Sequence, residues 1–136
     1  MPESTLDPTS QQLSALSADR SEATIVMVNL LRFKHRADGV LADESVSGEE
    51  AYRRYGEAVA SSLARVGGSL EFVGQGKQTV IGPDGERWDL IALVRYPSRK
   101  AFIEMVGDPE FLQKHELRNA ALADSRLICS EPLDFG

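Results

Sequence analysis

His115 and Arg118 are two polar residues, one helical turn apart on a segment that we expect to be helical. Phe111 and Leu122 flank them at helical spacing, so the four residues share one face whose two ends are apolar. A guanidinium on such a face needs a carboxylate, a carbonyl or a bound anion, because an unpaired buried charge is costly. Histidine exchanges protons near neutral pH. We therefore take this pair as the candidate catalytic residues, with Arg118 holding an anion and His115 moving a proton.

The same pattern has a structural interpretation, in which both side chains serve packing and not chemistry. A lone histidine on an apolar face is commonly a hydrogen-bonded core residue. Arg118 would then form an internal ion pair with one of three acidic residues, Asp89, Asp124 or Glu104. The sequence leaves both interpretations open.

Four further residues are candidates for ligand binding because they bring polar groups into apolar surroundings. They are Asn29, Tyr55, Trp88 and Asp89, which supply an amide, a phenol, an indole N–H and a carboxylate. A mostly apolar lining with a few convergent polar groups is typical of a small-molecule site. For Trp88 and Tyr55 the alternative is a structural role, in which the ring packs in the core and its one polar group forms a hydrogen bond.

Several motifs of catalysis and metal binding are missing from the sequence. It contains no Gly-rich phosphate loop, no pair of histidines at metal-ligand spacing and no nucleophile elbow. Its single cysteine, Cys129, falls in a short apolar strand, where a thiol is expected to be inert packing. We therefore expect no metal site and no cofactor.

Composition limits the range of partners. The 136 residues carry a net charge of -6 and are 42% hydrophobic, which is typical of one globular domain and unfavourable for binding nucleic acid. No apolar run approaches the roughly 20 residues that span a bilayer, and the first residues do not have the order of a signal peptide. The expected location is cytoplasmic, with no membrane partner.

The first half of the chain contains two predicted helices and a strand between them. Asp7 and Pro8 predict the start of a short helix over residues 7–18. Residues 24–33 are apolar at both odd and even positions, a pattern typical of a strand buried on both faces, which predicts a central strand. The polar connection 34–46 is expected to be a mobile loop or a lid. The second helix runs from a capping box of Ser47 and Glu50 to a stop at Gly67 and Gly68.

The second half continues with strands and helices in an order that defines the fold. Strands are predicted at 69–81, bent near Gly74 and Gly76, and at 88–96. Ser98 and Asp108 each cap a helix, and a last strand covers about 126–130. The order is βαββαβ, which predicts an α+β, ferredoxin-like domain with a four-stranded antiparallel sheet and helices on one face.

The strands 24–33 and 88–96 are apolar on both faces, although helices cover only one face of such a sheet. The same face of a second copy is the economical cover, so we expect a homodimer that packs through its sheet faces. The predicted organisation is an N-terminal extension with a short helix at 1–23, a domain at 24–132 and a C-terminal tail at 133–136.

A family resemblance supports this prediction. The sequence resembles the domain of unknown function 1330 family, within the dimeric α+β barrel superfamily, over about residues 24–132. The resemblance rests on seven short motifs in order: Val-Met-Val-Asn-Leu-Leu-Arg-Phe, Glu-Ala-Tyr-Arg-Arg-Tyr, Val-Gly-Gly, Trp-Asp, Tyr-Pro-Ser-Arg, Asp-Pro-Glu-Phe and Ala-Asp-Ser-Arg-Leu-Ile. It implies a barrel formed by two subunits and names no substrate. The wider superfamily includes cofactor-free monooxygenases, lactone isomerases and heme-binding enzymes, so the fold selects no reaction.

By the same resemblance, seven residues fall where similar sequences tend to keep polar or aromatic groups: Asn29, Tyr55, Trp88, Asp89, His115, Arg118 and Asp124. Phe111 stands where many relatives are expected to have tyrosine, so a mechanism that needs a phenol there is in doubt.

Two functional hypotheses follow. One is an enzyme that acts without a cofactor on a small apolar carboxylate or carbonyl compound, and the other is a non-catalytic module that binds a small molecule or a partner.

Overall fold

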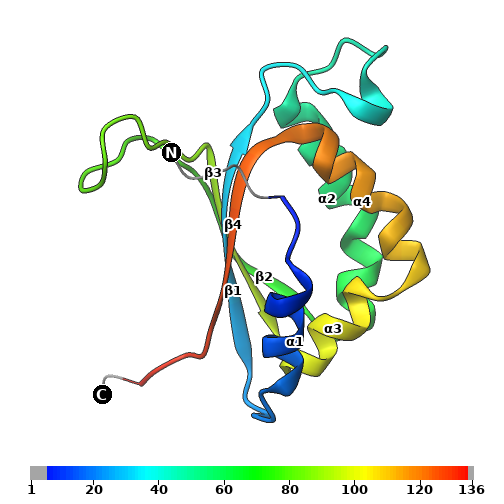
Figure 1. The fold of residues 1–136 in the computed structure, drawn as a ribbon, viewed down its shortest axis with the longest axis vertical. Helices are drawn as coiled ribbons and strands as arrows, with labels where there is room; N and C mark the ends of the chain where they lie inside the picture. The colour runs from blue at the N-terminus through cyan, green and yellow to red at the C-terminus, as the bar shows by residue number, and fades with distance from the viewer. Residues whose placement is uncertain (1–5, 135–136) are drawn as a thin grey trace.

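The computed structural model describes residues 6–134 and contains a four-stranded antiparallel sheet with helices packed against one of its faces (Figure 1). The sheet order is β2-β3-β1-β4. The elements, in chain order, are α1 (Ser10–Ala18), β1 (Ile25–Phe33), η1 (Gly39–Leu41), α2 (Gly48–Arg65), β2 (Ser69–Gln75), β3 (Leu90–Tyr96), α3 (Arg99–Val106), α4 (Pro109–Ala121) and β4 (Leu122–Ser130). The predicted βαββαβ order and the α+β class are confirmed.

β1 lies between β3 and β4, as predicted for a central strand. Its residues alternate between the two faces of the sheet, so that Ile25, Met27 and Leu31 are buried beneath the helices. Val28 and Leu30 point to the opposite, helix-free face, which we call the open face. β1 is therefore apolar on both sides, but its own chain covers only one of them.

The open face carries one apolar row across all four strands. Val28 of β1 pairs with Leu93 of β3 and with Ile128 of β4. Leu93 pairs in turn with Phe72 of β2. Since paired residues of adjacent strands point to the same side, these four side chains share the open face.

The long connection between β2 and β3 and the segment that follows β4 both extend from the open side of the sheet (Figure 1). The expected strand 69–81 is too long, because β2 ends at Gln75 and the chain leaves the sheet there. The pairing of β2 shifts between Leu70 and Phe72, and not at the glycines where a bend was expected. Val80 and Ile81 of this connection are exposed.

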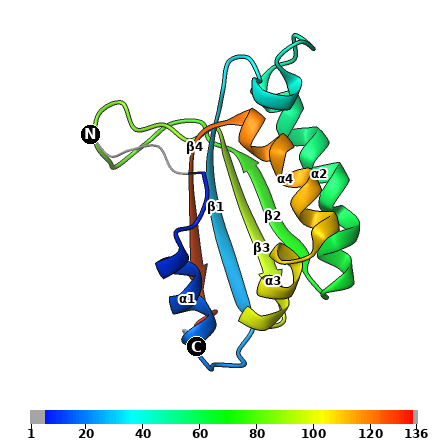
Figure 2. The same cartoon turned by 45° about the vertical axis from the view of Figure 1, so that its right-hand side comes forward.

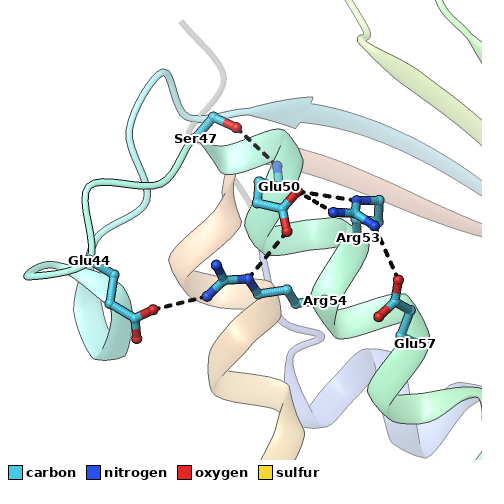
Figure 3. Close-up of polar contacts among 6 residues, drawn as sticks. All are labelled: Glu44, Ser47, Glu50, Arg53, Arg54 and Glu57. Atoms are coloured by element: carbon cyan, nitrogen blue, oxygen red, sulfur yellow. Dashed lines mark hydrogen bonds and ion pairs between the residues drawn. The ribbon is translucent and has the colours of Figure 1, made fainter.

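The N-terminus of α2 agrees only in part with the predicted capping box (Figure 3). The Ser47 hydroxyl accepts a hydrogen bond from the Glu50 amide at 3.0 Å, as expected. The Glu50 carboxylate pairs with Arg53 and Arg54 instead of the Ser47 amide. These hydrogen bonds, that from Arg53 above all, lower the pKa of Glu50.

The connection 34–46 packs against the helices, so the expectation of a mobile loop or lid is wrong. Ala37 and Leu41 are buried in a cluster with α2 and α4 residues. The Ala37 amide donates to the Val46 carbonyl, and the Asp38 amide donates to the Ala120 carbonyl. Backbone hydrogen bonds and two buried side chains hold this segment in place.

The N-terminal helix begins later than expected. Thr9 caps α1, with a reciprocal hydrogen bond between its amide and the Gln12 side chain, so Asp7 is not the cap. α1 buries none of its own residues and packs beside α3, with Leu16 touching the core (Figures 1 and 2). Along the described chain, no helix has the length and apolar character needed to cross a bilayer.

Candidate functional site

α4 places His115 and Arg118 one turn apart, as the sequence predicted. Asp108 caps this helix by accepting from the Glu110 amide, and Pro109 occupies its first turn. Phe111 on the same face is buried, and Leu122 begins β4 and is also buried. β4 therefore starts four residues earlier than the predicted strand at 126–130, directly after α4.

Arg118 is only 8% exposed. Its Nη1 donates to the Leu6 carbonyl at 2.5 Å, and its Nη2 donates to the Ser125 hydroxyl at 3.3 Å. Both of these acceptors are neutral. Within residues 6–134 no carboxylate lies close enough to form an ion pair with Arg118. From the described part of the chain the buried guanidinium therefore receives neutral dipoles and no negative charge, a costly state for a cation removed from water.

The three acidic residues considered as partners of Arg118 are engaged elsewhere. Asp89 accepts from the Phe33 amide at 2.8 Å and lies 3.5 Å from Arg87. Asp124 pairs with Arg126 at 2.8 Å. Glu104 faces Lys100 on the surface of α3. The expectation of an internal ion pair through one of these residues is wrong for the described part of the chain.

His115 contacts the N-terminal segment through one ring nitrogen. Its Nε2 lies 2.5 Å from Asp7 Oδ1. Its Nδ1 is buried, with no hydrogen-bond partner in residues 6–134. The ring also lies near Phe111, with 6.3 Å between centroids. If Asp7 accepts a hydrogen bond from the Nε2–H group, the lone pair of the neutral imidazole falls on the buried Nδ1.

A chain of aromatic rings connects β1 through α2 to His115. Phe33 and Tyr52 are 5.7 Å apart, Tyr52 and Tyr55 are 5.4 Å apart, and Tyr55 and Phe111 are 6.4 Å apart. Burial raises the pKa of both tyrosines, and the nearby Arg118 guanidinium opposes that rise. Neither phenol forms a hydrogen bond with another described residue. Two phenol groups thus stand close enough to the buried cation to feel its charge.

Of the four predicted ligand-binding residues, only Tyr55 joins the pair on α4. Asn29 lies on the covered face of β1, where its amide makes long hydrogen bonds of 3.4 Å to the Met27 and Ala92 carbonyls. Trp88 donates to Glu86 and lies against the guanidinium of Arg126, an open-face residue opposite Leu30. Asp89 holds the backbone at the end of β1. The expected four-residue pocket is therefore not formed in one place.

The sequence analysis missed Leu6, Asp7, Phe33 and Tyr52 as members of this site. Tyr52 recurs with Tyr55 at helical spacing, which was a usable signal. Leu6 and Asp7 are more than 100 residues from α4 in sequence, and nothing in their local pattern predicts that contact. Among the described residues, no three or more His, Cys, Asp or Glu side chains are grouped so that they could hold a metal ion. Burial raises the pKa of Cys129, which disfavours a reactive thiolate.

Comparison with known proteins establishes the family. The family model described as a domain of unknown function (DUF1330) matches residues 40–131, more than half of the chain. Two crystal structures of the RPA0582 protein, which is described as a protein of unknown function from Rhodopseudomonas palustris, are similar over nearly the whole length. One is 36% identical, with a TM-score of 0.92, and covers 99% of both chains. The other is 37% identical, with a TM-score of 0.89, and covers 96% of this chain and 98% of that one.

A more distant similarity concerns the fold. A Bacteroides fragilis protein, described as dimeric, of unknown function and with a ferredoxin-like fold, is 14% identical with a TM-score of 0.50. The match covers 79% of this chain and 95% of that one. No curated protein matches the sequence. The chain therefore has a ferredoxin-like fold and belongs to the domain of unknown function 1330 family, as its motifs predicted.

Proposed function

We propose that this protein binds a small apolar carboxylate or carbonyl compound at the site formed by Arg118 and His115. The observation that carries the proposal is the buried guanidinium of Arg118, whose hydrogen-bond acceptors within residues 6–134 are the neutral oxygens of Leu6 and Ser125. A ligand carboxylate can accept two parallel hydrogen bonds from a guanidinium, and charge-assisted bonds of this kind are about twice as strong as neutral ones. An anion is therefore the partner that this cation lacks among the described residues.

The surroundings of Arg118 support an apolar ligand body. Phe33, Tyr52, Tyr55 and Phe111 form a row of ring contacts next to the pair, and the two phenols offer O–H donors without partners among the described residues. A site with aromatic walls and a few polar groups suits a small molecule that is mostly apolar and carries oxygen at one end.

His115 gives the proposed site the means to move a proton without a cofactor. Its Nδ1 is buried and has no partner in residues 6–134, so that a ligand oxygen or acidic C–H brought to this atom could exchange a proton with it. A reaction of this kind needs no metal and no redox group. If the protein only binds its ligand, His115 serves recognition, and the same contacts apply.

The proposed active form is a homodimer in which the open faces of two copies pack together. The row Phe72, Leu93, Val28 and Ile128 supports this arrangement, because an apolar row across four strands is normally covered. The dimeric description of the Bacteroides fragilis protein is consistent with it.

Native mass spectrometry of freshly purified protein tests the proposal directly. We expect a mass of two subunits together with a retained small acid, which would identify the ligand. Arg118→Gln should lose this added mass, whereas the control Arg87→Gln, which changes an exposed arginine, should keep it. Retention of the same molecule by Arg118→Gln would refute the assignment of the anion to Arg118.

Measuring turnover distinguishes the two hypotheses, an enzyme and a non-catalytic binding module. With the identified ligand as substrate, His115→Ala should reduce turnover by roughly 100-fold or more, since positioned proton transfer contributes about that much. Unchanged turnover would refute the proton-transfer role. Binding without any turnover in the natural protein would leave recognition as the function of the pair.

A further inference from the structure

We propose that Leu6 and Asp7 occupy the Arg118 and His115 site as an internal ligand, and that an apolar carboxylate with a second oxygen acceptor binds by displacing them. This inference rests on the proposed function. It adds the chemical class of the ligand and a means of regulation, because the segment that fills the site belongs to the protein's own N-terminal extension.

Three contacts of this dipeptide match the three parts expected of the ligand. The Leu6 carbonyl accepts from Arg118, and the Asp7 carboxylate lies on His115. The Leu6 side chain packs against the buried cluster that contains Leu31 and Leu122. One dipeptide therefore presents an apolar group, a carbonyl and a carboxylate to a site built for such groups.

The internal ligand is a poor match for the charges of the site, which makes it replaceable. Arg118, the more buried of the two residues, receives the neutral carbonyl, while the Asp7 carboxylate, 53% exposed, lies on His115 at the edge of the site. A free acid could place its carboxylate on Arg118 and a carbonyl or hydroxyl oxygen on His115. That exchange gives the buried cation the negative partner that it lacks within residues 6–134.

The helix after the segment that would move makes few buried contacts, although Asp19 at its end pairs with Arg99 at 3.4 Å. This helix, α1, buries none of its own residues, and only Leu16 touches the core cluster. α1 lies beside the sheet and α3 and outside the layer of α2 and α4 (Figure 2). Elements with few buried contacts open at low free-energy cost, so displacement of Leu6 and Asp7 need not disturb the sheet or α4.

Competition between the segment and a free ligand has a measurable consequence. The apparent dissociation constant equals the intrinsic constant divided by the fraction of molecules in which the site is empty. Weakening the contacts of Leu6 and Asp7 raises that fraction and tightens binding. A segment that instead closed over a bound ligand would give the opposite result.

The experiment uses the full chain and 4-methyl-2-oxopentanoate, a free acid with the branched side chain of leucine, a carbonyl and a carboxylate. Its dissociation constant is measured by isothermal titration calorimetry for the natural protein, for Leu6→Ala/Asp7→Asn and for the control Asp43→Asn, which changes an exposed residue of the 34–46 connection. We expect the double variant to bind roughly tenfold more tightly than the natural protein. The control should match the natural protein. Unchanged or weaker binding by the double variant would overturn the inference.

Two further results separate this inference from the proposed function. In the first, the natural protein and the double variant bind the acid equally and Arg118→Gln does not bind it. This result would overturn the inference of an internal ligand but would leave the proposal of a carboxylate site at Arg118 intact. No binding by either protein would overturn both. Methyl NMR of Leu6 in the natural protein provides a test that does not depend on the variants: its signals should move toward random-coil positions as the acid is added, and unchanged signals in the bound state would refute displacement.

Discussion

The two faces of the sheet carry similar apolar residues but have opposite surroundings. On the covered face, Leu31 is 0% exposed beneath the helices. On the open face, Phe72 and Ile128 are 52% and 53% exposed. Apolar residues on the two faces therefore differ in burial because the chain supplies helices to one side alone. The open face is the one that the proposed dimer would cover, and the covered face is completed by the chain itself, including its N-terminal segment.

Alkaline pH should produce the largest effect, and it acts on the covered face. All three tyrosines, Tyr52, Tyr55 and Tyr96, lie there, and burial raises the pKa of each. Above the ordinary value near 10 the unfolded chain loses these protons while the folded chain keeps them, so the free energy of unfolding falls as pH rises. The expected slope is up to about 1.4 kcal/mol per pH unit for each tyrosine. Tyrosinate absorbance should therefore rise together with unfolding, and a rise near pH 10 in the folded state would contradict this account.

A matched pair of substitutions in β1 compares the two faces directly. Leu31→Ala should lower the free energy of unfolding by roughly 2–5 kcal/mol, because a cavity remains beneath the helices. Leu30→Ala, on the open face, should cost less in the isolated subunit. Chemical denaturation of both variants measures the difference. A loss at Leu31 below about 1 kcal/mol would contradict the assignment of this residue to the core.

A charge on the open face should break the proposed dimer while leaving the subunit folded. Leu93→Glu should weaken association roughly 100-fold, about 3 kcal/mol, because a carboxylate would be buried without a partner. Light scattering coupled to size-exclusion chromatography measures the subunit number. Leu112→Glu, at an exposed apolar position of α4, is the control and should leave the assembly unchanged. A Leu93→Glu protein that kept its natural assembly would refute the pairing of open faces.

The smallest expected effects compare two helix caps. Ser47→Ala should cost about 1 kcal/mol, because α2 packs on the sheet and loses the acceptor of the Glu50 amide. Thr9→Ala removes the cap of α1, which buries none of its own residues, and should change global unfolding by less than about 0.5 kcal/mol. Denaturation midpoints of the two variants test the order, and a larger loss at Thr9 would show that α1 is integral to the fold.

Local sequence signals were sufficient for the elements that depend on periodicity and capping. The capping residues Ser47, Ser98 and Asp108 mark helix starts as predicted, since each side chain accepts a nearby amide. Errors occurred where tertiary contacts outweigh local preference. Asp7 precedes a proline and has the appearance of a cap, but its carboxylate lies on His115. The polar 34–46 segment lacks periodicity, yet Ala37 and Leu41 anchor it in the core.

By itself, the sequence determined the order of strands and helices, the apolar character of both sheet faces and the placement of His115 and Arg118 on one helical face. These properties follow from residue spacing, which acts over a few positions along the chain. Only the tertiary structure decided which polar groups meet, because that depends on segments distant in sequence. It brought Leu6 and Asp7 to the α4 pair, and it separated Trp88 and Asp89 from that pair. The partner of a buried charge is set by the whole fold and not by its own helix.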